Sequence, residues 1–457
     1  MSLLTAGGGG AQKVAVELAN YLKEHGHEVV LIDFEWDKSQ IGRPFYQTAK
    51  GVALETVIKN EVSTMSGGLN GRIVPAGLQA ELTWYDKNLS AMQQLSGIFG
   101  RHRPDLVVSF LPSTFTLVAT VLKDTGISLV VGNQGEPAVD YTSDRYDPNP
   151  YDLKQRQAAP EQSVANVVLL DAFTDIFTPS VRKKTHVIGN PIIQSGGSNE
   201  SKRRPIILSA SRLAPVKNHA GAIRAFAKVA AKYPDWQLHI YGSGNLETEL
   251  KRLIVKLGLG KQVFLKGVSK DMDALYRQAS IYAQPSFFEG MSLALGEAMS
   301  HGLPCVVIDD CTSNRFIINK SQGGLSSANN TQAIASNFDK LMGDEQLRAK
   351  LGENARKYAA QFSREAVYSQ WYKLLSDLYR QLGSPPAKAY EKLADKPAIF
   401  MDHYDKCILK AIGFYENEID RQRQLVQSKK RENEALSQSR QYKLGHKLLA
   451  PVRKLRH

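Results

Sequence analysis

Short apolar runs alternate with amphipathic segments through the second half of the chain, over residues 203–361. Between these runs, apolar residues recur at helical spacing, for example in 220–232 and 247–257. Strands that alternate with helices in this way are typical of a parallel sheet covered by helices on both faces. The pattern therefore predicts an α/β domain. Its strand-length runs are 205–209, 237–241, 263–265, 281–283 and 304–308.

The first 193 residues repeat the alternation less regularly, with helical patterns at 14–25 and 82–99. A small, polar stretch at 194–202 (QSGGSNESK) separates the two halves and is typical of an interdomain linker. We therefore predict an α/β chain with two Rossmann-like domains, residues 1–193 and residues 203–361. The strand candidates of the first domain are 3–6, 28–33, 105–110, 127–131 and 167–170.

The pattern changes after Ser363. Arg364–Leu382 reads as one amphipathic helix, and residues 383–386 interrupt it. A long polar helix is predicted over 405–437 within a helical tail at 383–457. Its heptad pattern is broken, so self-association through 405–437 as a coiled coil is a weak alternative. The apolar faces are Val367, Trp371, Leu374, Leu375 and Leu378 in the first helix and Ile408, Ile412, Tyr415, Ile419 and Val426 in the second.

Charge is concentrated at the end of the chain. The formal net charge is +13 over 457 residues, and residues 421–457 carry eleven Lys and Arg against two Glu, which is +9 of that total. A basic tail, rather than a basic protein, therefore requires explanation. The last nineteen residues, 439–457, hold six Lys and Arg and no acid.

Leu444, Leu448 and Leu455 share one helical face in this last segment, opposite Lys443 and Lys447. This arrangement predicts an interfacial helix on an anionic membrane. The alternative is a frayed basic terminus without a partner. Nucleic acid is not expected, because no recognisable module and almost no aromatic interleaving is present.

Cysteine, histidine and apolar content exclude several classes of protein. The three cysteines form no CxxC pair and cannot build a disulfide framework, which indicates a reducing compartment. The ten histidines show no metal-ligand spacing, so no metal is expected. No run of about 18 apolar residues and no secretory leader is present, so neither a membrane span nor secretion is expected.

Two glutamates, Glu289 and Glu297, flank the start of a predicted helix that follows the strand ending near Gln284. Ligands of open parallel sheets bind at the carboxyl ends of the strands, and free backbone N–H groups at a helix start attract anions. Carboxylates at this edge can hold sugar hydroxyls. The alternative is a pair of surface acids at a helix start. The N–H groups concerned belong to Gly290, Met291, Ser292 and Leu293.

Arg212 and Lys217 follow the first strand of the second half. A guanidinium fork and a point charge together suit a diphosphate, although a solvated loop would look the same. Glycine-rich turns follow two further strands, at 7–10 and at Gly242–Ser243–Gly244, where the backbone can approach a ligand closely. Many strand-to-helix turns share this composition.

Asp271 and Asp273 spell the DxD of metal-dependent sugar transferases. They precede an amphipathic segment, so we expect one of them to cap a helix rather than to bind a metal.

Taken together, these motifs resemble the retaining glycosyltransferases of family 4, which have the GT-B fold of two Rossmann-like domains facing a cleft. The resemblance covers most of residues 3–380 and is carried by five stretches besides VIGNP. These are GGGGAQKVAVELANYLKEHGHEV, SASRLAPVKN, IYGSGNLETEL, FLKG and QPSFFEGMSLALGEAMSHGLP.

The resemblance implies a role for each motif. Arg212 and Lys217 would neutralise the diphosphate, Glu289 would contact the donor sugar, and Glu297 would hold the ribose. Residues 266–268 would border the base, and residues 362–382 would cross back onto the first domain. The catalytic set would be Glu289, Arg212 and Lys217, and the donor-binding set Gly9, Gly10, Gly242, Gly267, Gly290, Met291, Ser292, Leu293 and Glu297.

The sequence departs from the family pattern at three places. Residues 131–137 lack the usual histidine, for which Asn133 or Glu136 could substitute. Residues 310–316 lack a glutamate, and the first strand is short, so the natural start is expected upstream of Met1.

The resemblance further implies retention of configuration with no cofactor other than the donor and no metal. A UDP-sugar is favoured over a GDP-sugar.

We therefore expect a retaining transferase that moves a hexose or N-acetylhexosamine onto a growing, lipid-linked glycan. Its pathway would be lipopolysaccharide, O-antigen or capsule synthesis at the inner face of the bacterial cell membrane. The alternatives are a non-catalytic GT-B scaffold for glycan assembly and, less favoured, a GT-B epimerase.

Overall fold

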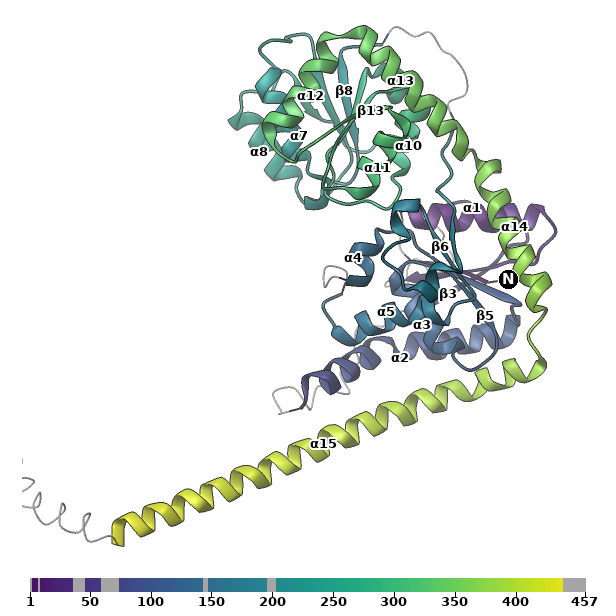
Figure 1. Cartoon of the computed structure of the whole chain (residues 1–457), viewed down its shortest axis with the longest axis vertical. Coiled ribbons are helices and arrows are strands. Elements are labelled where there is room, and N and C mark those ends of the chain that lie inside the picture. Colours follow the sequence, from purple (N-terminus) through teal and green to yellow (C-terminus); the bar gives the residue numbers. More distant parts are fainter. Residues whose placement is uncertain are drawn as a thin grey trace, which may run out of the picture.

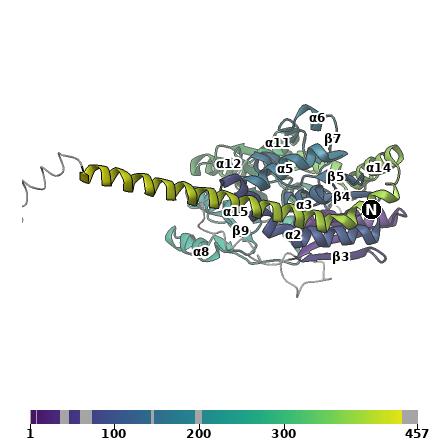
Figure 2. The ribbon, with the colours of Figure 1, turned by 90° about the horizontal axis from the view of Figure 1, so that it is seen from below.

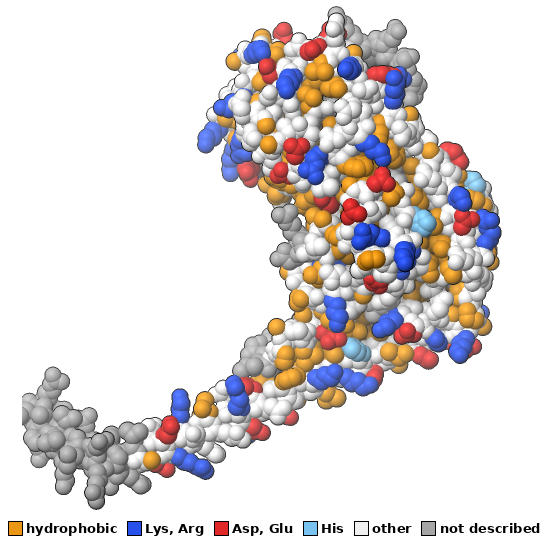
Figure 3. Space-filling view, viewed as in Figure 1, with side chains coloured by type: hydrophobic (Ala, Val, Ile, Leu, Met, Phe, Trp, Pro, Cys, Tyr) orange, Lys and Arg blue, Asp and Glu red, His pale blue; other side chains and the backbone are white. Residues whose placement is uncertain are grey.

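A computed structural model describes residues 2–6, 9–35, 46–58, 74–142, 147–194 and 203–438. Two α/β domains are stacked end to end, and a long helix runs beneath the N-terminal one (Figure 1). The surface is hollowed on one side between the two domains (Figure 3). Among the described residues, no helix is long and apolar enough to cross a membrane.

The N-terminal domain contains a seven-stranded parallel sheet of order β3-β2-β1-β4-β5-β6-β7. The connections reverse direction between β1 and β4, which makes the carboxyl ends of these strands the expected ligand-binding crevice. The strands are β1 (Ser2–Ala6), β2 (Val30–Glu35), β3 (Ala53–Ile58), β4 (Leu106–Phe110), β5 (Ser128–Gly132), β6 (Ala165–Val168) and β7 (Thr185–Val187).

Helices cover both faces of this sheet. The apolar side chains of α2 pack into the core under one face, and those of α1 share a second core with the other face. The helices are α1 (Gly10–Glu24), α2 (Ala76–His102), α3 (Pro112–Leu122), α4 (Pro137–Thr142), α5 (Pro150–Gln162) and α6 (Pro179–Arg182), with a 3-10 turn η3 (Asp171–Phe173).

The C-terminal domain contains a six-stranded parallel sheet of order β10-β9-β8-β11-β12-β13. Its switch point lies between β8 and β11, so the loops after these two strands meet at one crevice. The strands are β8 (Ile206–Ala210), β9 (Gln237–Tyr241), β10 (Val263–Leu265), β11 (Ile281–Gln284), β12 (Cys305–Ile308) and β13 (Gly324–Ser327).

Seven helices and two 3-10 turns complete this domain. They are η4 (Pro215–Lys217), α7 (His219–Val229), α8 (Glu247–Lys256), α9 (Met272–Gln278), α10 (Leu293–Ser300), α11 (Thr312–Ser321), α12 (Thr331–Gly343), α13 (Glu345–Ala359) and η5 (Ala360–Phe362).

Helix α14 (Arg364–Leu382) returns from the C-terminal domain and packs on the N-terminal one (Figure 1). Trp371 is 1% exposed and lies edge-on to Phe110 of β4, at 5.5 Å between ring centroids. Tyr368 donates a hydrogen bond to the carbonyl of Val14 in α1 at 3.3 Å. Leu374 and Leu375 of α14 are also buried, so the buried face of this helix is the apolar face that the sequence predicts.

Helix α15 (Ala387–Gln438) is 52 residues long and runs alongside α2 in both ribbon views (Figures 1 and 2). The helix predicted over 405–437 therefore begins too late. Pro397 and the many charged residues around it obscure the helical pattern in the first part of α15, which packs on the domain. Side chains beyond position 419 are exposed as far as residue 435. The residues buried against the domain are Ala389, Leu393, Lys396, Phe400, Tyr404, Cys407 and Ala411.

The structure confirms the predicted parallel α/β class and the helical C-terminal region. The sequence analysis missed the edge strands β3, β7 and β13, of which β7 is three residues long. It also missed α3, which is buried on nearly every side and so lacks the polar face that marks an amphipathic helix. Residues 195–202 of the predicted linker and the whole of 439–457 lie outside the described residues.

Candidate functional site: the crevice between the two sheets

Glu289 and Lys217 are brought together by the switch point of the C-terminal sheet. Lys217 ends the 3-10 turn after β8, and Glu289 lies in the loop after β11. The Lys217 Nζ stands 2.7 and 2.8 Å from the two carboxylate oxygens of Glu289. Both side chains are largely shielded, at 15% and 11% exposure, so the pair is only weakly screened by solvent.

Gln284, which the sequence analysis used only as the end of a strand, orients Glu289. Its Nε2 donates to Glu289 Oε1 at 2.9 Å, while its Oε1 accepts from Ser292 Oγ at 3.1 Å. Ser292 also caps α10 by accepting from the amide of Leu295 at 3.3 Å. The carboxylate and the helix start are therefore held by one hydrogen-bonded chain.

Glu297 lies within α10 and has different partners. Its Oε2 accepts from the hydroxyl of Tyr276 at 3.3 Å. Its Oε1 is 3.7 Å from Lys13 Nζ, which belongs to α1 of the other domain. Burial, the neighbouring Tyr282 and Glu297 raise the pKa of Tyr276, so this hydroxyl stays a proton donor to Glu297.

The predicted start of α10 requires a small correction. The helix begins at Leu293 with Ser292 as its N-cap, so Gly290 and Met291 precede it in the loop. Met291 is buried, and its carbonyl accepts from Asn190 Nδ2 at 3.1 Å. The donor-binding amides predicted at 290–293 are thus split between a loop and a first helical turn.

Arg212 extends from the loop after β8 and is exposed. Among the described residues its guanidinium has no hydrogen-bond or ion-pair partner. The loop itself is braced by His219, whose Nε2 lies 3.2 Å from the Arg212 carbonyl. Burial lowers the pKa of His219 to about 4, so this brace is a neutral imidazole at physiological pH.

Gly242 and Gly267 follow the strands β9 and β10, beside the loop that carries Arg212. Gly242 has φ +138, and a Cβ there would lie 2.0 Å from the carbonyl oxygen of Ser211. Its amide donates to the Gly267 carbonyl at 2.8 Å. Gly242 therefore lets the turn after β9 pack closely against the Arg212 loop, and the Gly267 carbonyl holds that turn in place.

Glycines also allow the two domains to touch. A Cβ on Gly290 would lie 2.1 Å from the Gln134 carbonyl of the N-terminal domain. A Cβ on Gly10 would stand 3.4 Å from Leu293 Cδ1 across the interface, whereas Gly9 has no neighbour within 4 Å of that position. Gly7 and Gly8 of the predicted turn lie outside the described residues.

The two stand-ins for the missing histidine occupy different positions. Asn133 is buried and uses its amide inside the N-terminal domain, donating to Asn166 and accepting from Tyr141. Glu136 instead points across to α11, where it hydrogen-bonds Thr312 and lies near Arg315. Burial raises the pKa of Glu136, and those two partners oppose the shift. Glu136 is therefore the stand-in that reaches the other domain.

Asp271 caps α9 by accepting from the amide of Ala274 at 3.0 Å, which confirms the expected cap. Asp273 pairs with His301 at 2.8 Å and with Arg277 at 2.7 Å. Within the described residues, neither aspartate belongs to a group of three potential metal ligands.

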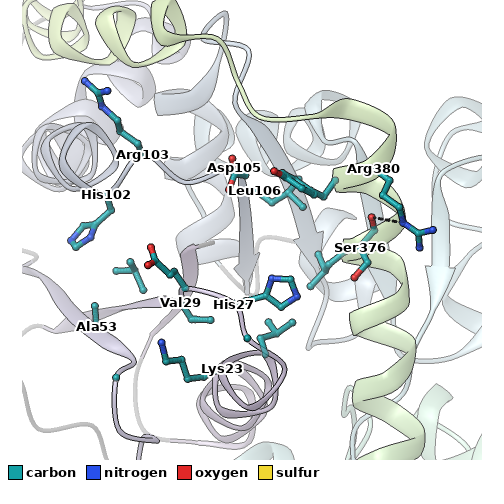
Figure 4. Close-up of a pocket in the computed structure, with 17 residues that line it drawn as sticks. Lys23, His27, Val29, Ala53, His102, Arg103, Asp105, Leu106, Ser376 and Arg380 are labelled. Atoms are coloured by element: carbon teal, nitrogen blue, oxygen red, sulfur yellow. Dashed lines mark hydrogen bonds between the residues drawn. The ribbon is translucent and has the colours of Figure 1, made fainter.

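A separate cavity of about 570 Å³ lies at the amino ends of β2, β3 and β4, beside α14 (Figure 4). Its wall mixes basic Lys23, His102 and Arg103 with acidic Glu28 and Asp105. None of the predicted donor-binding residues lines it, because these residues are at the opposite, carboxyl ends of the strands.

Comparison with known proteins matches both halves of the chain. A model described as Glycosyltransferase Family 4 matches residues 8–192, and one described as Glycosyl transferases group 1 matches residues 193–358. The chain belongs to the family 4 glycosyltransferases.

Two relatives are similar over part of this family 4 chain. An exopolysaccharide phosphotransferase of Streptomyces coelicolor is 34% identical over 43% of the chain and 21% of its own length. A poly(glycerol-phosphate) alpha-glucosyltransferase of Bacillus subtilis is 31% identical over 43% of the chain and 28% of its own length. The chain thus spans less than a third of either relative.

The Anabaena protein HepE, solved in complex with UDP, has a TM-score of 0.64 to this structure. It is 17% identical over 82% of the family 4 chain and 100% of its own. At this identity the likeness shows the fold alone, and that fold is GT-B, as the sequence predicts.

Proposed function

We propose that this family 4 protein is a retaining glycosyltransferase that moves a hexose or N-acetylhexosamine from a UDP-sugar to a growing glycan. The observation that carries the proposal is the Lys217–Glu289 pair at the switch point. The helix that follows, α10, places Glu297 3.7 Å from Lys13 and Leu293 beside Gly10 of the N-terminal domain. Cations and carboxylates that line one crevice suit a ligand with both phosphates and hydroxyls.

The diphosphate would take Lys217 away from Glu289. A phosphate bears more charge than a carboxylate, so it would compete with Glu289 for the Lys217 Nζ. Arg212 would add its unpaired guanidinium from the same loop. Glu289 would keep its hydrogen bond from Gln284. Once Lys217 has left, its carboxylate oxygens could accept hydrogen bonds from sugar hydroxyls.

Catalysis would follow from stabilising the departing nucleotide. Negative charge grows on the phosphate oxygens as the glycosidic bond breaks, and preorganised cations and amides stabilise it as it forms. Attack of the acceptor on the same face, with the departing phosphate taking its proton, would retain configuration. In this scheme no metal is needed.

A uridine donor is favoured by the likeness to HepE, which was solved with UDP. The Bacillus subtilis relative, a poly(glycerol-phosphate) alpha-glucosyltransferase, supports a polymer as the acceptor. A lipid-linked glycan of lipopolysaccharide, O-antigen or capsule type at the inner face of the cell membrane fits the basic segment 439–457.

The exposed part of α15 supports a role in assembly. Leu409, Phe414, Leu425 and Val426 are each at least half exposed on a helix that extends beyond the domain (Figure 1). Self-association through 405–437 would cover them. A non-catalytic scaffold would use the same surface, but it would not require the paired Lys217 and Glu289.

Product analysis with UDP-sugars and a lipid-linked acceptor tests this proposal. Glycosyl transfer releases UDP, whereas transfer of a sugar phosphate, as the name of the Streptomyces relative suggests for that protein, would release UMP. Release of UDP together with an α-linked product from an α-linked donor is expected. UMP as the product, or no nucleotide release with any UDP- or GDP-sugar, would refute it.

A further inference from the structure

Three side chains with metal-binding atoms meet where α15 packs on α2. Glu81 comes from α2, and His403 and Cys407 come from α15. His403 Nε2 lies 2.9 Å from Glu81 Oε1 and 3.6 Å from Cys407 Sγ, and the three ligand atoms lie within 4.8 Å of one another. His403 and Cys407 are four residues apart, so both project from one face of the helix.

The two separations from His403 Nε2 are close to those of a tetrahedral zinc site. With Zn–S at about 2.3 Å and Zn–N at about 2.0 Å, the sulfur and nitrogen ligands stand about 3.5 Å apart. The observed 3.6 Å between Cys407 Sγ and His403 Nε2 matches that value. The nitrogen and carboxylate oxygen would need to separate by only a few tenths of an ångström to about 3.3 Å, which the flexible Glu81 side chain permits.

The surroundings favour a bound ion over a plain ion pair. Cys407 is 2% exposed, and the His403 ring lies 4.9 Å from the ring of buried Tyr85, so one side of the site is dry and its ligands have fixed positions. The His403 side chain is 44% exposed, which leaves the other side open for a water as fourth ligand.

We propose that Glu81, His403 and Cys407 bind one Zn²⁺ ion that fastens α15 to the N-terminal domain. The site lies near the last buried residue of the helix, Ala411, after which α15 leaves the surface. A metal there would fix the direction in which the exposed part of α15 extends. Sequence spacing concealed this site, since Glu81 and His403 are 322 positions apart.

The test uses the full chain without a histidine tag, and elemental analysis gives its zinc content. One Zn²⁺ per chain is expected. Replacing it with Co²⁺ should produce a thiolate-to-cobalt charge-transfer band in the near ultraviolet, because the thiolate is a ligand. This measurement needs only the wild-type protein. If no charge-transfer band is seen with one equivalent of Co²⁺, the proposal is refuted.

Variants then identify the ligands. Cys407→Ser should abolish the charge-transfer band. It should also weaken Zn²⁺ binding, measured by competition with a chromophoric chelator, by more than the about 10- to 100-fold typical of losing a partner outside the ligand set. Glu55→Gln is the matched control, because Glu55 and His102 form a similar pair at 2.6 Å. Zinc content equal in Cys407→Ser and wild-type protein would overturn the proposal.

Discussion

Lys217 and Glu289 form a two-pronged ion pair across the switch point of the C-terminal sheet, with one ammonium within 2.8 Å of both carboxylate oxygens. The two residues are 72 positions apart in sequence and meet because β8 and β11 are neighbours. Their loops are further tied by the Phe287 amide, which donates to the Val216 carbonyl at 2.9 Å. The pair is therefore built by topology rather than by local sequence.

Replacing either partner should disable transfer. Lys217→Ala and Glu289→Ala are each expected to lower turnover by at least about 100-fold, as for loss of one charge-stabilising group. Lys232→Ala is the control. Lys232 forms an exposed ion pair with Asp339, at 2.6 Å between Nζ and Oδ1, and this pair does not belong to the crevice. Steady-state rates with a UDP-sugar measure the effect, and near-wild-type rates in either crevice variant would exclude this site.

Gly290→Ala should impair the approach of the two domains. The added methyl would lie 2.1 Å from the Gln134 carbonyl, so the loop after β11 would have to withdraw from the N-terminal domain. We expect at least a tenfold fall in kcat/KM, about 1.4 kcal/mol, without loss of folded protein.

The matched control for Gly290→Ala is Gly100→Ala, which has nothing within 4 Å of the new methyl. Since it lies inside α2, it should stabilise the fold by about 0.5–1 kcal/mol and leave kcat/KM unchanged. An active Gly290→Ala enzyme would show that the contact with Gln134 does not matter for transfer.

Asp140→Asn should stabilise the protein near neutral pH. Burial raises the pKa of Asp140 from 3.8 to about 7, so the unfolded chain ionises before the folded one as pH rises. The free-energy cost of keeping the Asp140 carboxyl group buried therefore grows from about pH 4 to pH 7. It reaches about 4 kcal/mol, at about 1.36 kcal/mol per pKa unit. Unfolding by urea at pH 4, 5.5 and 7 should show the gain growing with pH.

An exposed aspartate provides the control for that series. Asp235→Asn, at the surface, should change the unfolding free energy little at each pH. A gain for Asp140→Asn that stays constant from pH 4 to pH 7 would mean that its carboxyl group is not the cause.

Deleting residues 439–457 should release the protein from anionic vesicles, because six basic residues contribute about 1 kcal/mol each near such a surface. Transfer to a soluble acceptor analogue should continue at the wild-type rate. Replacing the six Lys and Arg by Gln in the full chain separates charge from length. Vesicle co-sedimentation that survives both changes would refute the membrane role.

Local patterning identified the elements whose sequence is sufficient to define them. β9 and β10 were predicted at their observed bounds, and α14 was predicted from end to end. Buried and half-buried residues alternate in β9, β10 is a run of three apolar residues, and α14 buries one face, so each leaves a clear pattern. The edge strand β3 was missed, since its first residues are exposed and carry no apolar run.

Long-range partners in the crevice could not be read from the sequence. Gln284 belongs to an apolar strand, and its contact with Glu289 depends on the turn that follows β11. Lys13 reaches Glu297 only through the stacking of two domains. Asn133 shows the opposite case. The sequence offers it as a site residue, but its side-chain amide hydrogen-bonds to Asn166 and Tyr141 inside the N-terminal domain.

The most direct test of the central claim measures UDP and UDP-sugar binding by calorimetry in the wild-type protein and two variants. Lys217→Ala should weaken both ligands, because both carry the diphosphate. Glu289→Ala should weaken the UDP-sugar at least about tenfold while leaving UDP unchanged, since this carboxylate is assigned to the sugar hydroxyls. If neither variant changes the affinity for UDP or for the UDP-sugar relative to the wild-type protein, the account is contradicted.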